Sequence, residues 1–239
     1  MRAAAIIPAR LGSTRFPEKP LAMLGGKCLI TRVWEAVVKT ALFDEVIVAT
    51  DDERILEVVL AAGGKAQMTR SDHPSGSDRV AEVASGLEAD IIVNVQGDEP
   101  FISAEVLKPL LESFRDDEVQ MASLMTPILD DKMLHDPGCV KVVTDASGRA
   151  LYFSRSLIPY DRDGKSGYKY MRHIGVYAWR KETLLEFVSL SVGKLESVEK
   201  LEQLRVLENG IGIYMVETDY QGIGIDTLED LERAERMIK

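Results

Sequence analysis

Residues 3–15 read AAAIIPARLGSTR, a short apolar run that passes directly into a loop of basic, hydroxyl and glycine residues. The apolar part, residues 3–7, ends at Pro8 and predicts a buried strand. Apolar side chains then recur at helical spacing over residues 30–38, and a second strand-like run follows at residues 46–49. The chain is therefore expected to begin with a strand, a loop, a helix and another strand.

The same alternation continues through the first half of the chain. A helix is predicted over residues 55–62, where Gly63 and Gly64 supply a stop signal. Another helix over residues 80–87 precedes a strand over residues 91–95. Strands that alternate with helices form βαβ units, so the predicted fold is α/β, with a mostly parallel central sheet and helices on its faces.

The second half of the chain has a mixed pattern. Strands are predicted at residues 140–143, 173–178 and 211–216, and a polar loop at residues 161–169. Helices are predicted over residues 197–208 and 228–238, the second with Thr227 as its N-cap. Because neither a repeat nor a linker divides the sequence, residues 1–239 are predicted to form a single domain with a smaller mixed insertion.

The composition excludes several classes of protein. The 239 residues carry a net charge of −10, which argues against a general nucleic-acid-binding surface. No apolar run approaches the ~20 residues of a membrane-spanning helix. Two cysteines, Cys28 and Cys139, make a disulfide framework or a structural zinc site unlikely, so a reducing cytoplasm is the expected location.

The loop after the first strand has the composition of an oxyanion-binding site. Its basic, hydroxyl and glycine residues are Arg10, Gly12, Ser13, Thr14, Arg15 and Lys19. Backbone amides and fixed positive charges of this kind can hold a triphosphate. The sequence is neither a Walker A nor a GxGxxG motif. A solvated loop whose cations balance nearby acids is the alternative.

Two aspartates are candidate ligands for Mg²⁺. Asp98 follows the third predicted strand, beside Gly97, whose lack of a side chain admits a close backbone approach. Mg²⁺ is commonly bound by one or two carboxylates together with phosphate oxygens and water. Asp226 lies just before the last predicted helix, where an aspartate is equally often only a cap.

Taken together, these motifs resemble those of the 3-deoxy-manno-octulosonate cytidylyltransferase (CMP-Kdo synthetase) family. The resemblance covers nearly the whole chain and rests on several separate segments in the expected order. These are residues 7–21, 49–51, 75–79, 94–100, 150–155, 173–177, 201–205 and 225–231.

The resemblance implies a Rossmann-like nucleotidyltransferase that works as a homodimer. It would use CTP and Mg²⁺ to convert 3-deoxy-D-manno-octulosonate (Kdo) into CMP-Kdo and pyrophosphate for lipopolysaccharide biosynthesis. The implied CTP-binding residues are Pro8, Ala9, Arg10, Ser13, Lys19, Arg70, Ser75, Gly76 and Gln96. Those implied to bind the sugar acid are Gln96, Arg155, Arg162, His173, Tyr177, Glu202 and Gln203. Asp98 and Asp226 would hold magnesium, and with Arg10 and Lys19 they would form the catalytic set.

The residues themselves partly support the sugar-acid assignment. An acidic protein needs a local arginine to bind a carboxylate, and Arg155 and Arg162 are candidates, a surface ion pair being the alternative. His173 and Tyr177 alternate along one predicted strand and should share a face, although a satisfied core histidine is the other interpretation. Glu202 and Gln203 would face solvent, judged only from the leucines of their helix.

Neither cysteine lies in a phosphate-binding loop and the sequence shows no Ser–His pair, so direct attack on the α-phosphorus of CTP, without a covalent enzyme intermediate, is expected. Alternative acceptors are 8-amino-Kdo and a sialic acid. The alternative outside the enzymes is a non-catalytic module that binds a sugar nucleotide.

Overall fold

The computed structural model describes residues 1–12, 16–222 and 224–238, and the chain divides into two compact units. The first unit comprises residues 1–108, 180–188 and 222–239, and the second comprises residues 109–179 and 189–221. Helix α4 (Ala104–Glu112) crosses the boundary in the sequence between them. This division does not decide between one domain and two, so the single domain stays a prediction.

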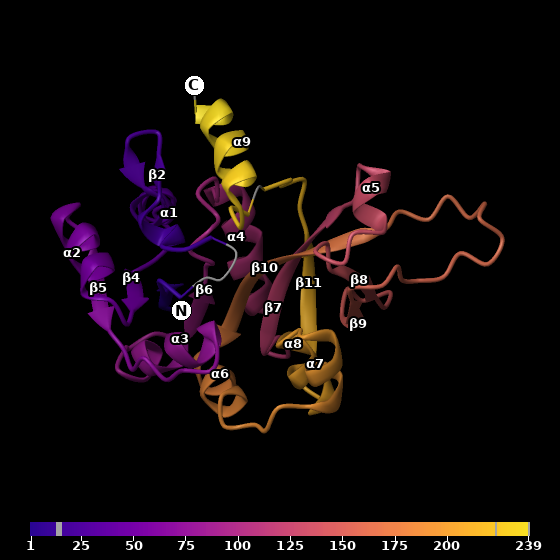
Figure 1. The fold of residues 1–239 in the computed structure, drawn as a ribbon. Coiled ribbons are helices and arrows are strands. Elements are labelled where there is room, and N and C mark those ends of the chain that lie inside the picture. Colours follow the sequence, from indigo (N-terminus) through magenta and orange to yellow (C-terminus); the bar gives the residue numbers. More distant parts are fainter. Residues whose placement is uncertain (13–15, 223, 239) are drawn as a thin grey trace. The chain divides into compact units, whose positions relative to one another are not determined.

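The strands of the first unit are parallel, as the alternating sequence predicts. They are β1 (Ala3–Ala9), β4 (Glu45–Thr50), β5 (Lys65–Met68) and β6 (Ile91–Asn94), in the order β6-β1-β4-β5 (Figure 1). Ile6 lies opposite Ile47 on one side of β1 and opposite Asn94 on the other. Because the strands are parallel, their carboxyl ends lie along one edge of the sheet.

Side chains cap the starts of several helices of the first unit. The helices of this unit are α1 (Leu29–Lys39), α2 (Glu53–Ala61), α3 (Gly76–Ser85), α6 (Lys181–Phe187) and α9 (Leu228–Ile238). A 3₁₀ turn at Lys19–Leu21 and a small hairpin of β2 (Met23–Leu24) and β3 (Lys27–Cys28) lie between β1 and α1. Asp52 caps α2 by accepting a hydrogen bond from the Arg54 amide at 2.9 Å, and Ser75 caps α3. Gly63, with φ of 82°, follows α2 as the sequence predicts.

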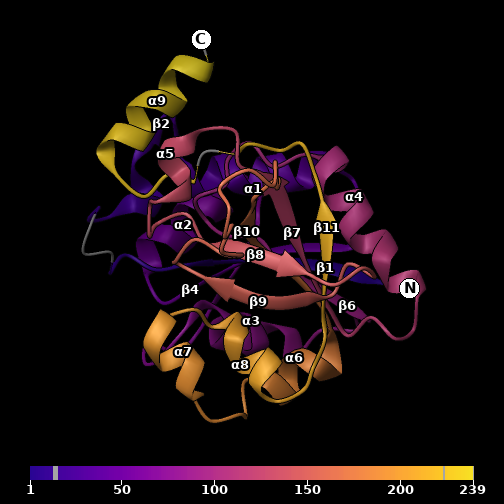
Figure 2. The same ribbon diagram turned by 90° about the vertical axis from the view of Figure 1, so that its right-hand side faces the viewer.

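The second unit is mixed, again as predicted. Strand β7 (Met121–Pro127) lies between β11 (Ile213–Glu217), with which it is parallel, and β10 (Met171–Arg180), with which it is antiparallel. Strands β8 (Lys141–Thr144) and β9 (Ala150–Ser154) run side by side in opposite directions, and β8 pairs with β10 (Figure 2). The remaining elements are a 3₁₀ turn at Ser113–Arg115 and the helices α5 (Asp131–Leu134), α7 (Lys194–Glu199) and α8 (Gln203–Glu208).

The sequence patterns missed β2, β3, β5, β7 and β9, and the physical reasons differ between β5 and β7. Strand β5 reads KAQM and is largely exposed at the end of the strand order, so it shows no apolar run. Strand β7 is buried, but Ser123 and Thr126 interrupt its apolar residues. Ser123 satisfies its hydroxyl by donating to the carbonyl of Val176 on β10 at 2.8 Å, an arrangement that only the tertiary pairing supplies.

The prediction of one helix over residues 197–208 is wrong. The chain forms α7, turns at Lys200 in the left-handed region with φ of 54°, and starts again as α8. The three-residue spacing correctly places Leu201 and Leu204 inside, but Val198 is 83% exposed. Gln203, expected to face solvent, is only 3% exposed, because the break rotates α8 relative to the predicted helix.

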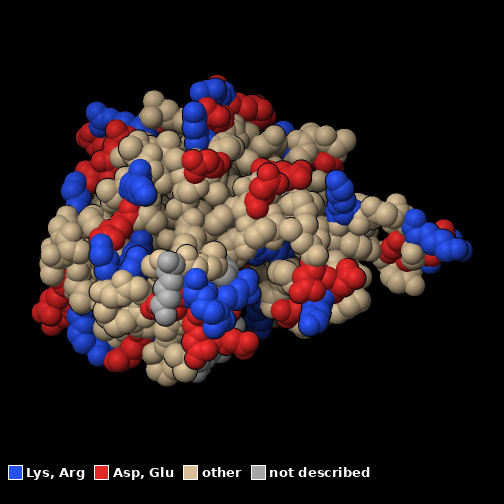
Figure 3. Space-filling model, turned by 90° about the horizontal axis from the view of Figure 1, so that it is seen from above, with Lys and Arg blue, Asp and Glu red and all other residues tan. Residues whose placement is uncertain are grey.

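No helix in the described part of the chain combines the length and apolarity needed to cross a lipid bilayer. On the face seen in Figure 3, basic side chains lie among acidic ones. Neither sign of charge therefore dominates the face seen in this view.

Two truncations in the second unit test the break in the helix, because the break buries one side chain and exposes the other. Leu204→Ala should lower the free energy of unfolding by about 2–5 kcal/mol, because it removes a fully buried side chain. Val198→Ala should change it by less than about 0.5 kcal/mol, since that side chain is exposed. Urea unfolding followed by circular dichroism measures both values. Equal losses in the two variants would contradict the break at Lys200.

Candidate active site

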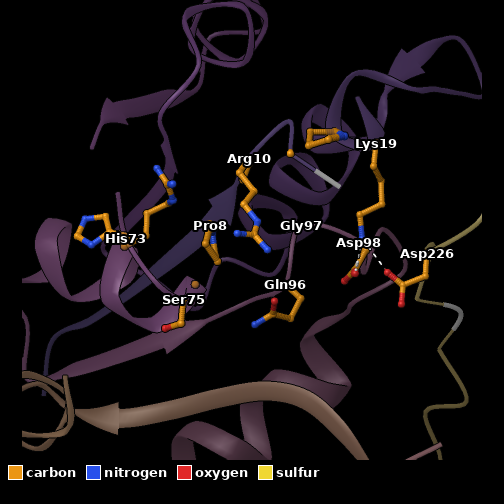
Figure 4. Close-up of a pocket in the computed structure, with 14 residues that line it drawn as sticks. Pro8, Arg10, Lys19, His73, Ser75, Gln96, Gly97, Asp98 and Asp226 are labelled. Carbon is orange, nitrogen blue, oxygen red and sulfur yellow. Dashed lines mark hydrogen bonds and ion pairs between the residues drawn. The ribbon is translucent and has the colours of Figure 1, made fainter. Parts of the chain in front are cut away.

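A cavity of about 390 Å³ lies in the first unit at the carboxyl ends of β1 and β6 (Figure 4). This size is typical of sites for small molecules, and the strand ends are where α/β sheets bind them. Its lining comes from the loop after β1, the start of α3, the segment after β6 and the turn before α9. The residues are Pro8, Ala9, Arg10, Gly12, Lys19, Pro20, His73, Ser75, Gly76, Arg79, Gln96, Gly97, Asp98 and Asp226.

Most of the predicted nucleotide-binding residues meet in this cavity. Those that line it are Pro8, Ala9, Arg10, Lys19, Ser75, Gly76, Gln96, Asp98 and Asp226. Ser13 lies outside the described residues. Arg70 does not line the cavity: it is exposed, forms an ion pair with Asp72 at 2.7 Å, and borders a second hollow between α3 and α6. A role for Arg70 in binding CTP stays a prediction.

Lys19 joins the two candidate metal ligands. Its Nζ donates to Asp98 Oδ2 at 2.8 Å and to Asp226 Oδ1 at 3.0 Å, and its side chain is only 16% exposed. Burial by itself would lower the pKa of the ammonium, but the charges and hydrogen bonds of Asp98 and Asp226 outweigh it, so the pKa is raised. Lys19 is therefore protonated at neutral pH and offsets one of the two negative charges of the carboxylates, with both of which it pairs.

The structure separates Asp226 from the cap of the last helix. The Thr227 hydroxyl accepts a hydrogen bond from the Asp230 amide at 3.2 Å, as expected of the N-cap of α9. The carboxylate of Asp226 instead points to Lys19 in the cavity (Figure 4). The residue is thus placed for chemistry, while Thr227 does the capping that the sequence assigned to it.

Gly97 allows the cavity to form between two strand ends. A Cβ built at this position would lie 3.1 Å from the carbonyl oxygen of Pro8, closer than side chains normally pack. A side chain at residue 97 would therefore require the end of β1 or the segment after β6 to shift by a few tenths of an ångström. This confirms the close backbone approach predicted for Gly97.

Arg79 is a cavity residue to which the sequence reasoning gave no role. It is 3% exposed and forms an ion pair with Asp51 at 2.8 Å, while its other terminal nitrogen donates to the Thr69 hydroxyl. This network ties the start of α3 to the ends of β4 and β5. Two features of the sequence could have indicated this ion pair. Arg79 directly precedes the helix predicted over residues 80–87, and Asp51 follows the strand predicted over residues 46–49.

His73 is a second cavity residue that was missed. Its Nε2 contacts the carboxylate of Glu82 within α3, and the same carboxylate accepts a hydrogen bond from the Arg70 amide at 3.2 Å. Glu82 therefore fixes the loop that leads into α3. The 9-residue separation of His73 and Glu82 gave no local signal, because the contact depends on the loop folding back on the helix.

Three of the predicted sugar-acid residues lie together in the second unit. The rings of His173 and Tyr177 are 5.4 Å apart, which confirms that they share a face of β10. The Tyr177 hydroxyl donates to Gln203 Oε1 at 3.3 Å. Gln203 Nε2 is buried with no hydrogen-bond partner in the described part of the protein. A buried amide donor left unpaired is costly unless a ligand accepts its hydrogen bond.

His173 also forms the Ser–His pair that the sequence did not show. Ser123 Oγ lies 2.9 Å from His173 Nε2, but Ser123 is completely buried and donates to the carbonyl of Val176. Because the single hydroxyl proton is used there, Nε2 must carry the proton of a neutral imidazole. Burial lowers the pKa of His173 to about 3, which agrees with the neutral form, and burial also raises the pKa of Tyr177. The pair is therefore structural rather than a hydroxyl activated for attack.

The other predicted sugar-acid residues are spread over the second unit. The Arg155 guanidinium donates to the carbonyls of Glu199 and Pro137, each at 2.8 Å, so it holds the end of α7 rather than a surface carboxylate. Arg162 is exposed in the loop between β9 and β10. Glu202 precedes α8 and is partly buried.

A parallel α/β unit with a basic loop and paired carboxylates at its strand ends has the features of an enzyme that handles nucleotides. A family model described as Cytidylyltransferase matches residues 4–217. The chain belongs to the 3-deoxy-manno-octulosonate cytidylyltransferase family, a family of nucleotidyltransferases.

Its similarity to individual members extends over the full length. The chain is 52% identical to the 3-deoxy-manno-octulosonate cytidylyltransferase of Flavobacterium johnsoniae, with 100% of this chain and 99% of the relative covered. Identity to the protein of that name from Koribacter versatilis is 48%, covering 100% and 91%. A solved structure of CMP:2-keto-3-deoxy-manno-octonic acid synthetase complexed with CTP has a TM-score of 0.95 and 43% identity, covering 100% of this chain and 98% of that one.

The neutral, enclosed His173 predicts a specific dependence of stability on pH. The unfolded histidine gains a proton near pH 6.5, whereas the folded one stays neutral to about pH 3, so His173 makes the protein less stable as the pH falls through this range. In His173→Gln this contribution disappears. The slope of the free energy of unfolding against pH should become shallower by up to about 1.4 kcal/mol per pH unit between about pH 6.5 and about pH 4.

Urea unfolding at several pH values measures these slopes. His135→Gln is the matched control for the loss of a histidine side chain, because His135 is exposed at the end of α5. An unchanged slope in His173→Gln would show that the folded protein protonates this histidine as readily as the unfolded chain does.

Proposed function

We propose that this protein transfers CMP from CTP to the anomeric hydroxyl of Kdo, giving CMP-Kdo and pyrophosphate for lipopolysaccharide biosynthesis. The observation that carries the proposal is the meeting of Arg10, Lys19, Asp98 and Asp226 in one cavity, in a chain whose full-length relatives are named for this reaction. The supporting structural neighbour is a synthetase of this kind complexed with CTP.

In this proposal the first unit binds CTP. Arg10 is exposed at the cavity and Lys19 lies within it, so both can donate charge-assisted hydrogen bonds to the triphosphate. The cytidine side would be formed by Pro8 and Ala9 at the end of β1, with Ser75 and Gly76 at the start of α3. Ser13, Arg70 and Gln96 complete the predicted CTP contacts.

Asp98 and Asp226 would hold Mg²⁺. The two carboxylates fit a cation, because the ammonium of Lys19 already lies within hydrogen-bonding distance of both. Within residues 1–12, 16–222 and 224–238, no group of three or more His, Cys, Asp or Glu side chains is arranged to bind a metal. Two carboxylates suit Mg²⁺, which takes its remaining ligands from phosphates and water. When bound, the ion would neutralise charge on the phosphates.

The second unit would bind the sugar acid. Gln203 Nε2 offers an unpaired buried donor beside the Tyr177 hydroxyl, and the neutral His173 completes a surface that can hydrogen-bond sugar hydroxyls. Arg155 and Arg162 are the candidates for the carboxylate, with Gln96 and Glu202 as further contacts.

The transfer would proceed by direct displacement. The anomeric oxygen of Kdo forms a bond to the α-phosphorus of CTP, the bond from that phosphorus to the β-phosphate oxygen breaks, and the hydroxyl proton is released. Neither cysteine lines the cavity, and Ser123 is committed to a backbone carbonyl. The residues of the chain would thus act by positioning the two substrates and by stabilising charge.

The carboxylate pair gives the sharpest test of this mechanism. Asp98→Asn and Asp226→Asn should each lower turnover by about a hundredfold or more, as loss of a key charge-stabilising group does. Release of pyrophosphate from CTP in the presence of Kdo and Mg²⁺ measures the rate. Asp130→Asn is the matched control, because Asp130 caps α5 in the second unit and asparagine caps equally well.

Near-normal turnover in a folded Asp226→Asn protein would reject the two-carboxylate site. The same assay with 8-amino-Kdo and with a sialic acid decides the acceptor. Pyrophosphate release with none of the three acids would instead favour the non-catalytic sugar-nucleotide-binding module.

The proposed enzyme works in the cytoplasm as a homodimer, a state inferred from the family resemblance alone. Light scattering should give a mass about twice the 26.5 kDa of one chain. A mass of one chain at micromolar concentration would contradict the dimer and leave the proposed reaction unaffected.

A further inference from the structure

The ammonium of Lys19 lies where the proposed metal ion would be expected. Figure 4 shows the side chain reaching down from the 3₁₀ turn after β1 to the two aspartates. One nitrogen satisfies carboxylates that are 128 residues apart in the sequence, at 2.8 Å and 3.0 Å. Asp98 and Asp226 therefore share one cationic partner that belongs to the chain itself.

This contact has an electrostatic reason. Two carboxylates held close together repel each other, and partial burial strengthens that repulsion. The Lys19 side chain is 16% exposed and that of Asp98 is 23% exposed, so neither charge is fully screened by water. The ammonium thus stabilises an arrangement of carboxylates that would otherwise spread apart.

We infer that Lys19 holds the place of the divalent cation between Asp98 and Asp226 until the nucleotide binds, so that metal binding depends on the nucleotide. This inference rests on the proposed function. In the nucleotide-free protein, a metal ion must displace the ammonium from both carboxylates before it can bind them. A triphosphate in the same cavity offers Lys19 a different anion, because Lys19, Arg10 and the carboxylates all line one cavity.

The consequence is thermodynamic coupling through a single side chain. A ligand that draws the ammonium away frees the carboxylates for the metal, and by reciprocity the metal then favours the state of Lys19 that binds the ligand. The length and rotational freedom of a lysine side chain suit an exchange between two nearby anions. Binding of free metal ion to an empty enzyme is correspondingly disfavoured.

The inference is tested with Mn²⁺ alone, counted as free ion by its electron paramagnetic resonance signal, and without nucleotide. Lys19→Met should bind Mn²⁺ about tenfold or more tightly than the wild type, since the competing charge is removed from a partly buried site. Lys19→Arg keeps the charge and should bind Mn²⁺ as weakly as the wild type. Lys27→Met is the matched control: it also loses one charge, but Lys27 pairs with Glu35 at 2.5 Å on the surface, and its Mn²⁺ affinity should stay within about twofold of wild type.

The outcomes separate this inference from the proposed function. If Lys19→Met, folded by circular dichroism, binds Mn²⁺ no more tightly than the wild type, Lys19 does not occupy the metal position and the inference is overturned. If the tightening persists in Lys19→Met/Asp98→Asn, the ion binds elsewhere and the inference is likewise overturned. Wild type with CTP is the positive control, where protein, CTP and Mn²⁺ should bind together; failure of that arm alone would count against the proposed metal-dependent reaction.

Discussion

Parallel pairing of β1 with β4 and β6 is the constraint on which the rest of the first unit depends. Parallel strands end at the same edge of a sheet, so the segments after residues 9, 50 and 94 converge although they are far apart in the sequence. At Gly97 the backbone passes close beside the carbonyl of Pro8, an approach that a residue without a side chain accommodates. The cavity follows from these strand ends.

Electrostatics then organises the cavity in a protein with a net charge of −10. Two buried or partly buried ion-pair networks lie there: Lys19 with Asp98 and Asp226, and Arg79 with Asp51. In the first network Lys19 lies on the 3₁₀ turn after β1, Asp98 follows β6 and Asp226 precedes α9. In the second network Arg79 belongs to α3 and holds the wall of the cavity. Both cations line the cavity, but Arg79 is held by Asp51 and Thr69 and is 3% exposed, whereas Lys19 pairs with the two candidate metal ligands.

Three of the candidate sugar-binding residues of the second unit form an uncharged cluster, in contrast to the ion pairs of the first unit. The cluster of His173, Tyr177 and Gln203 is uncharged, because burial keeps the imidazole neutral and the phenol protonated. A neutral set of donors and acceptors suits hydroxyl groups, as the cationic loop of the first unit suits phosphates. The break at Lys200 is needed for this arrangement, since it turns Gln203 inward beside Tyr177.

The sequence by itself determined the βαβ alternation, the strand-end positions of Arg10, Lys19 and Asp98, and the cap at Thr227, because periodicity and capping act over a few residues. It did not reveal β5, whose exposed edge lacks an apolar run, or the break in the helix over residues 197–208, which local spacing opposes. Only the tertiary structure decided that Asp226 faces Lys19, that Arg79 and not Arg70 lines the cavity, and that Gln203 is buried. Each of these three outcomes depends on contacts between side chains that are distant in the sequence. Such contacts exist only once the chain has folded.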